Sequence, residues 1–281
     1  MSEKLIFFGE ENGLVGTLTM PEPTDAPLRS LAVVLFNSGF VHRVGPHRMN
    51  VRMARFFARA GYPALRFDFS GLGDSARIPS REDTLARSKG ELVAALNAAA
   101  ANTGVQRFVL VGLCSGTDHC INVAMDDSRV AGIVLLDPFA YPTWRTKLNY
   151  QFYRIRLQGS ALNVLNAVQR KTLWTIKSKL KRSSDTSQSS SFIVRPVPPR
   201  EDFEKQLGTA LDRQVHTLAI YSGNFPEWYN YQGQFAEAHK TLGKSPLLTH
   251  EYIPEANHTF TELQRMNALF DRVMQWATRL G

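Results

Sequence analysis

Short apolar runs recur along the chain at regular intervals, and polar, helix-like stretches separate most of them. The first two runs, residues 5–8 and 14–19, flank the turn-forming dipeptide Asn12-Gly13 and therefore predict a β-hairpin. The later runs are compact apolar stretches, which is typical of parallel strands buried on both faces. They comprise residues 31–36, 63–67, 108–111, 133–136, 216–221 and 248–253, so the pattern predicts eight strands in all.

Amphipathic segments lie between these runs and predict helices. They comprise residues 48–60, 81–101, 117–125, 202–211, 233–242 and 260–280. A hairpin followed by alternating strands and helices is typical of a doubly wound, mostly parallel sheet. With 281 residues, the chain is long enough to build one large α/β domain around this sheet.

The alternation of strands and helices is interrupted once, between the strands at 133–136 and 216–221. The intervening segment predicts helices at 145–158 and 162–181, followed by a serine-rich, flexible loop over 183–191. We therefore predict an α/β core formed by residues 1–140 and 201–281. We also predict that residues 141–200 form a helical cap over the carboxyl ends of the strands, where open α/β sheets carry their sites.

The positive charge of the chain is concentrated in this cap. The whole chain has a net charge of +8, whereas residues 141–200 contain twelve Lys and Arg against the single Asp185, a net charge of +11. This excess of positive charge has two interpretations. The segment is either a solvated cover over the site or a docking surface for a partner. The partner for docking would be an anionic substrate, an acidic acyl carrier protein or a membrane surface. Nucleic acid is not expected, because no nucleic-acid-binding motif accompanies the charge.

The run at 108–111 leads directly into Gly112-Leu113-Cys114-Ser115-Gly116. Two glycines around one central residue suit a tight strand-to-helix turn, because a side chain at either place would clash. The positive N-terminus of the following helix favours the nucleophilic thiolate form of Cys114. The motif therefore predicts a nucleophile elbow with cysteine in the nucleophile position. The alternative is a small buried cysteine after an ordinary strand.

A histidine and a carboxylate should complete such a site, in the chain order nucleophile, acid, histidine. His258 follows the last predicted strand and is the predicted general base. Asp137 and Glu227 are both candidates for the acid, since each follows a strand. Asn224 stands nearest to the expected carboxylate position in the second of these loops, and an amide cannot stabilise an imidazolium by charge. The sequence therefore favours Asp137.

An oxyanion hole needs two backbone N–H groups, and the sequence offers one after each of two strands. The N–H of Ser115, which follows Cys114, is the first candidate. The N–H of Phe40, in the turn after the strand at 31–36, is the second, with Gly39 letting the backbone approach. The glycine-containing turn at 68–75 is expected to be structural. The sequence has neither a dinucleotide fingerprint nor a P-loop nor metal-ligand spacing, so no cofactor or metal is expected.

Almost the whole chain resembles the α/β-hydrolase superfamily. Residues 37–48, 66–75 and 112–116 are similar to bacterial hydrolases found with exosortase and natural-product gene clusters. The position of Asp137 resembles that of the acid in the thioesterase domains of nonribosomal peptide and polyketide synthases. A cysteine nucleophile also occurs in dienelactone hydrolases and polyhydroxyalkanoate synthases. The chain departs from the usual serine hydrolase at Cys114 and at Ser38-Gly39, which replaces a His-Gly turn.

These features predict a thioesterase or acyltransferase that works through an acyl thioester on Cys114, with an acyl thioester as its substrate. A cysteine-dependent ester or lactone hydrolase is the first alternative, and a non-catalytic binding module with a hydrolase fold is the second. No apolar run approaches the roughly 18 residues of a membrane span. Two cysteines cannot build a disulfide framework, so a reducing cytoplasm is the expected location. The oligomeric state is left open.

Overall fold

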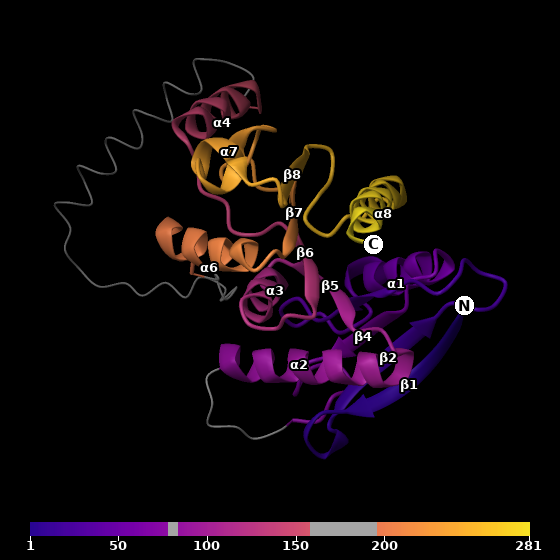
Figure 1. Cartoon of the computed structure of the whole chain (residues 1–281). Coiled ribbons are helices and arrows are strands. Elements are labelled where there is room, and N and C mark those ends of the chain that lie inside the picture. Colours follow the sequence, from indigo (N-terminus) through magenta and orange to yellow (C-terminus); the bar gives the residue numbers. More distant parts are fainter. Residues whose placement is uncertain (78–83, 158–195) are drawn as a thin grey trace, which may run out of the picture.

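The computed structural model describes residues 1–77, 84–157 and 196–281, and its strands occur where the apolar runs predict them (Figure 1). The strands are β1 (Ser2–Phe8), β2 (Leu14–Met20), β3 (Leu31–Leu35), β4 (Ala64–Asp68), β5 (Arg107–Leu113), β6 (Val130–Leu136), β7 (His216–Ser222) and β8 (Leu248–Ile253). They form one eight-stranded sheet in the order β1-β2-β4-β3-β5-β6-β7-β8. The β1–β2 and β2–β4 pairs are antiparallel and the later pairs are parallel, which confirms the predicted doubly wound sheet.

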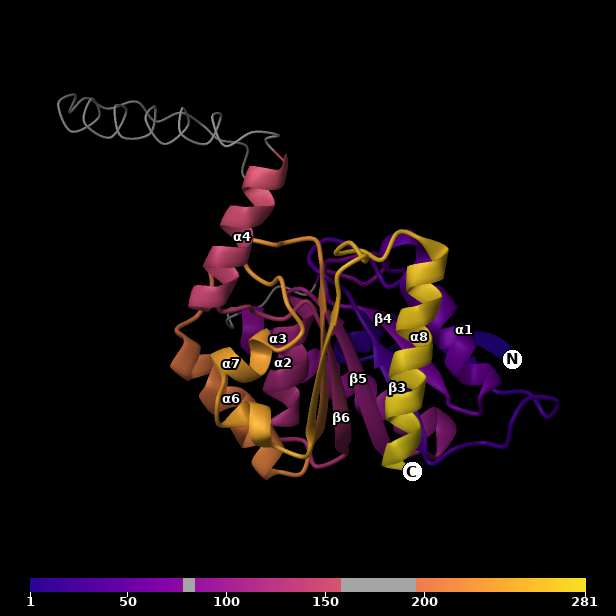
Figure 2. The same cartoon turned by 90° about the horizontal axis from the view of Figure 1, so that it is seen from above.

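Helices cover both faces of this sheet, so the molecule has three layers (Figure 2). The described α-helices are α1 (Met49–Arg59), α2 (Thr84–Thr103), α3 (Gly116–Ala124), α4 (Trp144–Leu157), α6 (Arg200–Asp212), α7 (Gln234–Ala238) and α8 (Leu263–Ala277). Helices α1 and α8 pack on one face, whereas α2, α3 and α6 pack on the other. Helix α4 projects beyond the layers and belongs to the predicted cap (Figure 2).

The central strands are buried on both faces, because helices from both outer layers cover them. All five residues of β3 are buried, and alternate ones face opposite layers. Phe57 of α1 and Phe270 of α8 fill one layer, while Leu96 of α2 and Leu207 of α6 fill the other. Full burial of one such side chain stabilises the fold by about 1.5–3 kcal/mol. The two apolar layers therefore fix the sheet and, with it, the positions of its carboxyl ends.

One close backbone approach joins β5 to α3. A Cβ at Gly112 would clash with the carbonyl oxygen of Gly116 and lie 2.8 Å from the backbone nitrogen of Thr117. Any side chain at position 112 would therefore push the first turn of α3 away from the end of β5. Glycine at this position is what makes the tight strand-to-helix turn possible.

Several predicted boundaries differ from the structure, and β6, for example, begins at Val130 rather than at residue 133. The β1–β2 hairpin closes through a short 3-10 helix at Glu10–Asn12, with Phe8 opposite Leu14, rather than through a two-residue turn at Asn12-Gly13. The helix predicted at 233–242 ends at Ala238 in α7, and a 3-10 helix at Leu242–Lys244 follows. The helix predicted to start at residue 260 starts at Leu263.

The predicted cap lies partly inside the described part of the chain. Its first helix, predicted at 145–158, is α4. The second helix, predicted at 162–181, and the serine-rich loop at 183–191 lie outside the described residues. Among the helices that the structure describes, none is long and apolar enough to cross a membrane.

Candidate active site

Cys114 occupies the turn between β5 and α3. Its φ of 54° lies in the left-handed region, which L-residues other than glycine, Asn and Asp seldom adopt. Its N–H donates to the carbonyl oxygen of Leu136 at 2.9 Å, and its own carbonyl accepts from the Thr117 hydroxyl at 2.7 Å. Its side chain is partly exposed. The strained turn thus holds the thiol at the carboxyl edge of the sheet, as the Gly-x-Cys-x-Gly motif predicts.

Asp137 and His258 lie side by side at the same edge. Asp137 follows the last residue of β6, and its Oδ2 lies 2.7 Å from Nδ1 of His258. Because a carboxylate only accepts hydrogen bonds, Nδ1 of His258 carries the proton in this bond. His258 lies in the loop between β8 and α8, five residues before Leu263 begins the helix, and its ring meets that of Phe225 edge-on.

Ser222, at the end of β7, anchors the carboxylate. Its N–H donates to Oδ1 of Asp137 at 2.6 Å, and its hydroxyl donates to Oδ2 at 2.7 Å. This residue is not among those that the sequence predicts for the site. Only its position points to the site. Ser222 is a polar residue at the end of β7, and β7 is the neighbour of β6, which ends one residue before Asp137. Two donors from one residue fix the carboxylate plane and therefore the direction of the His258 ring.

The pKa of His258 is about 9, above the ordinary value of 6.5. Burial acts to lower this pKa, but hydrogen bonds with Asp137 and with Cys114, together with electrostatic attraction to both groups, outweigh burial. His258 therefore bridges the carboxylate of Asp137 and the thiol of Cys114. At neutral pH this raised pKa favours the imidazolium form.

Glu227, the alternative acid, lies elsewhere. It is exposed in the loop after β7, and within the described residues no hydrogen bond or ion pair joins it to His258. Asn224, in the same loop, is also exposed and donates its N–H to Ser222 Oγ at 3.4 Å. The structure thus brings Asp137, and not Glu227, to the histidine.

The turn after β3 lies against the elbow. The Ser38 hydroxyl donates to the carbonyl oxygen of Leu113 at 2.8 Å, and the N–H of Gly39 donates to Ser115 Oγ at 3.1 Å. Gly39 has a φ of 53°, so this bend suits glycine. In the part of the chain that the structure describes, no protein acceptor is recorded for the N–H of Ser115 or of Phe40. The two predicted oxyanion donors therefore belong to two segments that are hydrogen-bonded to each other.

The fold has counterparts among known proteins. The sequence profile of the alpha/beta hydrolase fold matches residues 32–249, more than three quarters of the chain. The chain belongs to the alpha/beta hydrolase fold family. No match was found among curated proteins.

Solved structures share the fold of this α/β hydrolase at low sequence identity. An esterase domain from Rhodothermus marinus has 17% identity and a TM-score of 0.59, with 100% of each chain covered. An α/β serine hydrolase homologue from Coxiella burnetii has 14% identity and a TM-score of 0.58, covering 98% of this chain and 96% of its own. A serine hydrolase without a lid from Xanthomonas campestris has 14% identity and a TM-score of 0.56, with 99% and 95% covered.

A cavity of about 460 Å³ lies beside Ser222, the hydrogen-bond partner of Asp137, in this α/β hydrolase. Phe152 and Tyr153 of α4 line it on the cap side, and Tyr252 and Pro254 line it from β8 and the loop that follows. Gly223, the residue after Ser222, also lines it. The cavity therefore lies between the cap helix and the carboxyl ends of β7 and β8, next to the Asp137–Ser222 pair.

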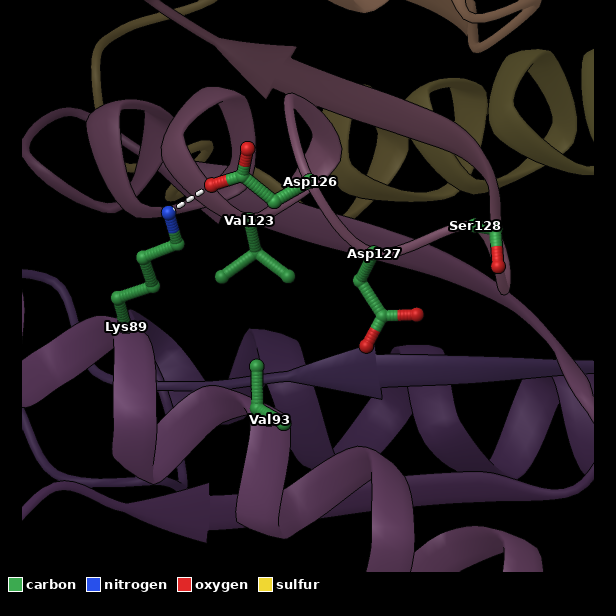
Figure 3. A pocket seen from close by; sticks show the side chains of 6 residues that line it. All are labelled: Lys89, Val93, Val123, Asp126, Asp127 and Ser128. Atoms are coloured by element: carbon green, nitrogen blue, oxygen red, sulfur yellow. Dashed lines mark hydrogen bonds and ion pairs between the residues drawn. The ribbon is translucent and has the colours of Figure 1, made fainter.

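A second cavity, of about 330 Å³, lies at the other end of α3 (Figure 3). Lys89 and Val93 of α2 face Asp126 and Asp127, which follow the last turn of α3, and Lys89 pairs with Asp126. Since α3 begins at the elbow and ends here, this cavity is at the opposite end of the sheet from Cys114. It contains none of the predicted site residues.

Two other features of the chain were candidates for a role in the site: the second cysteine and the residue types that bind metal ions. Cys120 is fully buried within α3, and burial raises the pKa of its thiol well above the ordinary value. Among the described residues, no group of His, Cys, Asp and Glu is arranged to hold a metal ion.

A buried polar network supports the turn after β3. Asp68, fully buried at the end of β4, pairs with the guanidinium of Arg43. Asn37 donates to Asp68 Oδ1 and to the carbonyl oxygen of Val41, both at 3.0 Å, and accepts from the N–H of Phe69 at 2.6 Å. The 68–75 turn is therefore structural, as predicted, but its partner is the loop that carries Phe40.

We expect the stability of this α/β hydrolase to fall as His258 loses its proton. The folded pKa of about 9 lies above the ordinary value of 6.5, so the stabilisation is fully present below pH 6.5 and is lost as the pH rises through 9. Free energies of unfolding in urea, measured from about pH 6 to about pH 10, should show this fall in the wild type. His258→Gln should show a much flatter curve, and parallel curves for the two proteins would contradict the raised pKa.

We expect Asp68→Asn to destabilise the protein by about 3–5 kcal/mol, because it leaves a largely buried guanidinium without its buried partner. Asp74→Asn is the matched control. Asp74 also pairs with Arg43, at 2.6 Å, but its side chain is 68% exposed, so its loss should cost less than about 1 kcal/mol. Urea denaturation measures the free energy of unfolding of both variants. Equal losses in the two variants would show that the burial of Asp68 does not determine how much its ion pair stabilises the fold.

Proposed function

We propose that this α/β hydrolase is a thioesterase or acyltransferase that forms an acyl thioester on Cys114. The observation that carries the proposal is the hydrogen-bonded series from Cys114 through His258 to Asp137, with the pKa of His258 at about 9. A histidine that keeps its proton at neutral pH, beside a thiol at a helix N-terminus, favours a thiolate–imidazolium pair. The nucleophile is then charged before the substrate arrives.

The thiol favours thioester substrates. Attack of a thiolate on an acyl thioester exchanges one thioester for another of similar energy, so the first step is close to balanced. Attack on an ordinary ester would produce a thioester of higher energy and a less stable leaving group. Acyl thioesters are therefore the substrate class that suits Cys114 best.

In the first step, the Cys114 sulfur attacks the thioester carbonyl carbon, and a new C–S bond forms. The resulting oxyanion accepts hydrogen bonds from the N–H groups of Ser115 and Phe40. As the bond to the leaving sulfur breaks, His258 gives its proton from Nε2 to that sulfur. Asp137 keeps Nδ1 protonated and stabilises the imidazolium before the transfer.

In the second step, water or an acceptor captures the acyl group. His258, now neutral, takes the proton of the incoming nucleophile, which attacks the acyl carbon. The bond to Cys114 breaks and the thiolate–imidazolium pair is restored. Hydrolysis and transfer thus differ only in the nucleophile that reaches the acyl-enzyme.

The cavity beside Ser222 supplies room for part of the substrate. Phe152, Tyr252 and Pro254 offer apolar surface there, whereas Asn149 and Asn230 offer amide groups. This mixture suits an acyl chain or a thiol arm that carries both methylenes and amides. An acidic acyl carrier protein is one form of donor that the net charge of +11 over residues 141–200 suits.

A cysteine-dependent ester or lactone hydrolase is the second candidate. The resemblance of the cysteine nucleophile to that of dienelactone hydrolases supports it, and so does the esterase domain among the similar structures. Intact-protein mass spectrometry after incubation with acyl thioesters, esters and lactones separates the two candidates. A mass increment from thioesters favours the first, whereas an increment from esters or lactones alone favours the second. No increment with any of them would favour a binding module.

We expect Cys114→Ala to lower kcat on the true substrate by about 10⁶-fold, the order found when a triad nucleophile is removed. Cys114→Ser should keep a small residual rate, because a hydroxyl needs stronger help from the base than a thiol does. Steady-state kinetics measures both, with circular dichroism confirming that the variants fold. A wild-type rate in Cys114→Ala would eliminate the elbow as the reactive site.

We expect Asp137→Asn to lower kcat by about 10⁴-fold, the effect of neutralising a triad acid. Glu227→Gln is the matched control, since Glu227 is exposed and lies in the neighbouring loop. Its kcat should stay close to the wild-type value. The reverse ranking would assign the acid to Glu227 instead.

A further inference from the structure

Helix α4 exposes apolar side chains along one face. The side chains of Trp144, Leu148, Phe152 and Ile155 are 71%, 45%, 62% and 38% exposed. At 3.6 residues per turn, these four positions fall within roughly a quarter of the helix circumference. They therefore form a continuous apolar stripe in solvent, which we call the α4 stripe, and such a stripe on a soluble domain marks an interaction site.

Cations border the α4 stripe on both sides. By helical spacing, Arg156 lies along one edge, and Lys147 and Arg154 lie along the other. Arg145 shares the first edge, but its guanidinium lies 4.6 Å from the centre of the Tyr231 ring, so it is directed toward the loop after β7. Residues 144–157 contain no Asp or Glu, and within the described residues no ion pair joins these four cations to a carboxylate. The face therefore combines aromatic and aliphatic side chains with an uncompensated positive charge.

The opposite face of α4 is fastened to the core. Thr146 is fully buried, and its carbonyl oxygen accepts from Asn230 Nδ2 at 2.9 Å. Asn149 donates to Asn230 Oδ1 at 3.1 Å, and the hydroxyl groups of Thr143 and Tyr231 lie 2.7 Å apart. These bonds set the rotation of the helix, so the α4 stripe faces away from the core. Figure 2 shows the helix projecting from the rest of the molecule.

We propose that the α4 stripe docks onto an anionic lipid surface, with the helix lying in the plane of the interface. Trp144 and Phe152 would enter the boundary between headgroups and acyl chains, where aromatic side chains are favoured. Lys147, Arg154 and Arg156 would meet the anionic headgroups. A lipid surface fits better than an acidic protein. An acidic protein surface would account for the cations, but it would not account for the exposed apolar side chains of Trp144 and Phe152. The loop that fastens α4, residues 223–233, adds only one carboxylate, Glu227.

This docking does not depend on the proposed chemistry, but it would bring the cap side of the cavity to a membrane surface. Phe152 belongs to the α4 stripe and also lines the cavity beside Ser222. A substrate held in a lipid layer would therefore meet the cavity without crossing open water.

Co-sedimentation of the full chain with lipid vesicles tests the proposal. The wild type should bind phosphatidylcholine vesicles that contain phosphatidylglycerol, and should bind pure phosphatidylcholine much more weakly. Trp144→Gln/Leu148→Gln/Phe152→Gln should weaken binding more than tenfold, because the inserted apolar surface is lost. Lys147→Gln/Arg156→Gln should weaken it about 25-fold, at roughly fivefold for each cation near an anionic surface.

Phe7→Gln and Leu263→Gln are the matched controls, since these side chains are 58% and 54% exposed but lie outside α4. Both should bind vesicles as the wild type does, and thermal unfolding followed by circular dichroism checks that every variant folds. The proposal is overturned if the wild type does not bind the anionic vesicles, or if the triple variant binds as tightly as the controls. Binding to an acidic acyl carrier protein without binding to vesicles would assign this face to a protein partner instead.

Discussion

The tight approach between the end of β5 and the start of α3 is the constraint on which the rest of the site depends. With glycine at position 112, the backbone of Gly116 can lie where a Cβ would otherwise be. Cys114 is then held in a left-handed turn, and its N–H reaches the carbonyl oxygen of Leu136. That bond ties the elbow to the residue before Asp137. The Ser38 hydroxyl ties the turn after β3 to Leu113 in the same way, so Cys114, Asp137 and the turn that carries Phe40 are held in fixed positions relative to one another.

The sequence predicted the sheet and the order of the site residues because both follow from local patterns. Continuous apolar runs mark the strands that helices cover on both faces, and the Gly-x-Cys-x-Gly spacing marks the elbow. The hydrogen bond between Asp137 and His258 joins residues 121 positions apart. Its prediction rested on the chain order nucleophile, acid, histidine, with each residue following a predicted strand.

Other features could not be read from local pattern. Asn37, Arg43 and Asp68 form one network only because β3 and β4 are neighbours in the sheet, and their spacing along the chain carries no signal of it. The early end of α7 has a similar cause. His239 leaves the helix, is 1% exposed and pairs with Glu204 of α6 at 2.9 Å. A tertiary contact therefore overrides a helical pattern that the sequence alone would continue.

The burial of Cys120 gives the chain a distinctive response to oxidants. The chain has two thiols, and Cys120 lies fully buried in α3 with its pKa raised, so Cys114 is the one that peroxide or an alkylating reagent meets. A sulfenic acid formed on Cys114 would find no resolving thiol in the same chain, because the second sulfur is sealed in the core. Such an oxidation would stop at an external thiol adduct or proceed to the irreversible sulfinic acid. The partly exposed thiol on which the proposed chemistry depends thus also makes this protein dependent on the low-molecular-weight thiols around it.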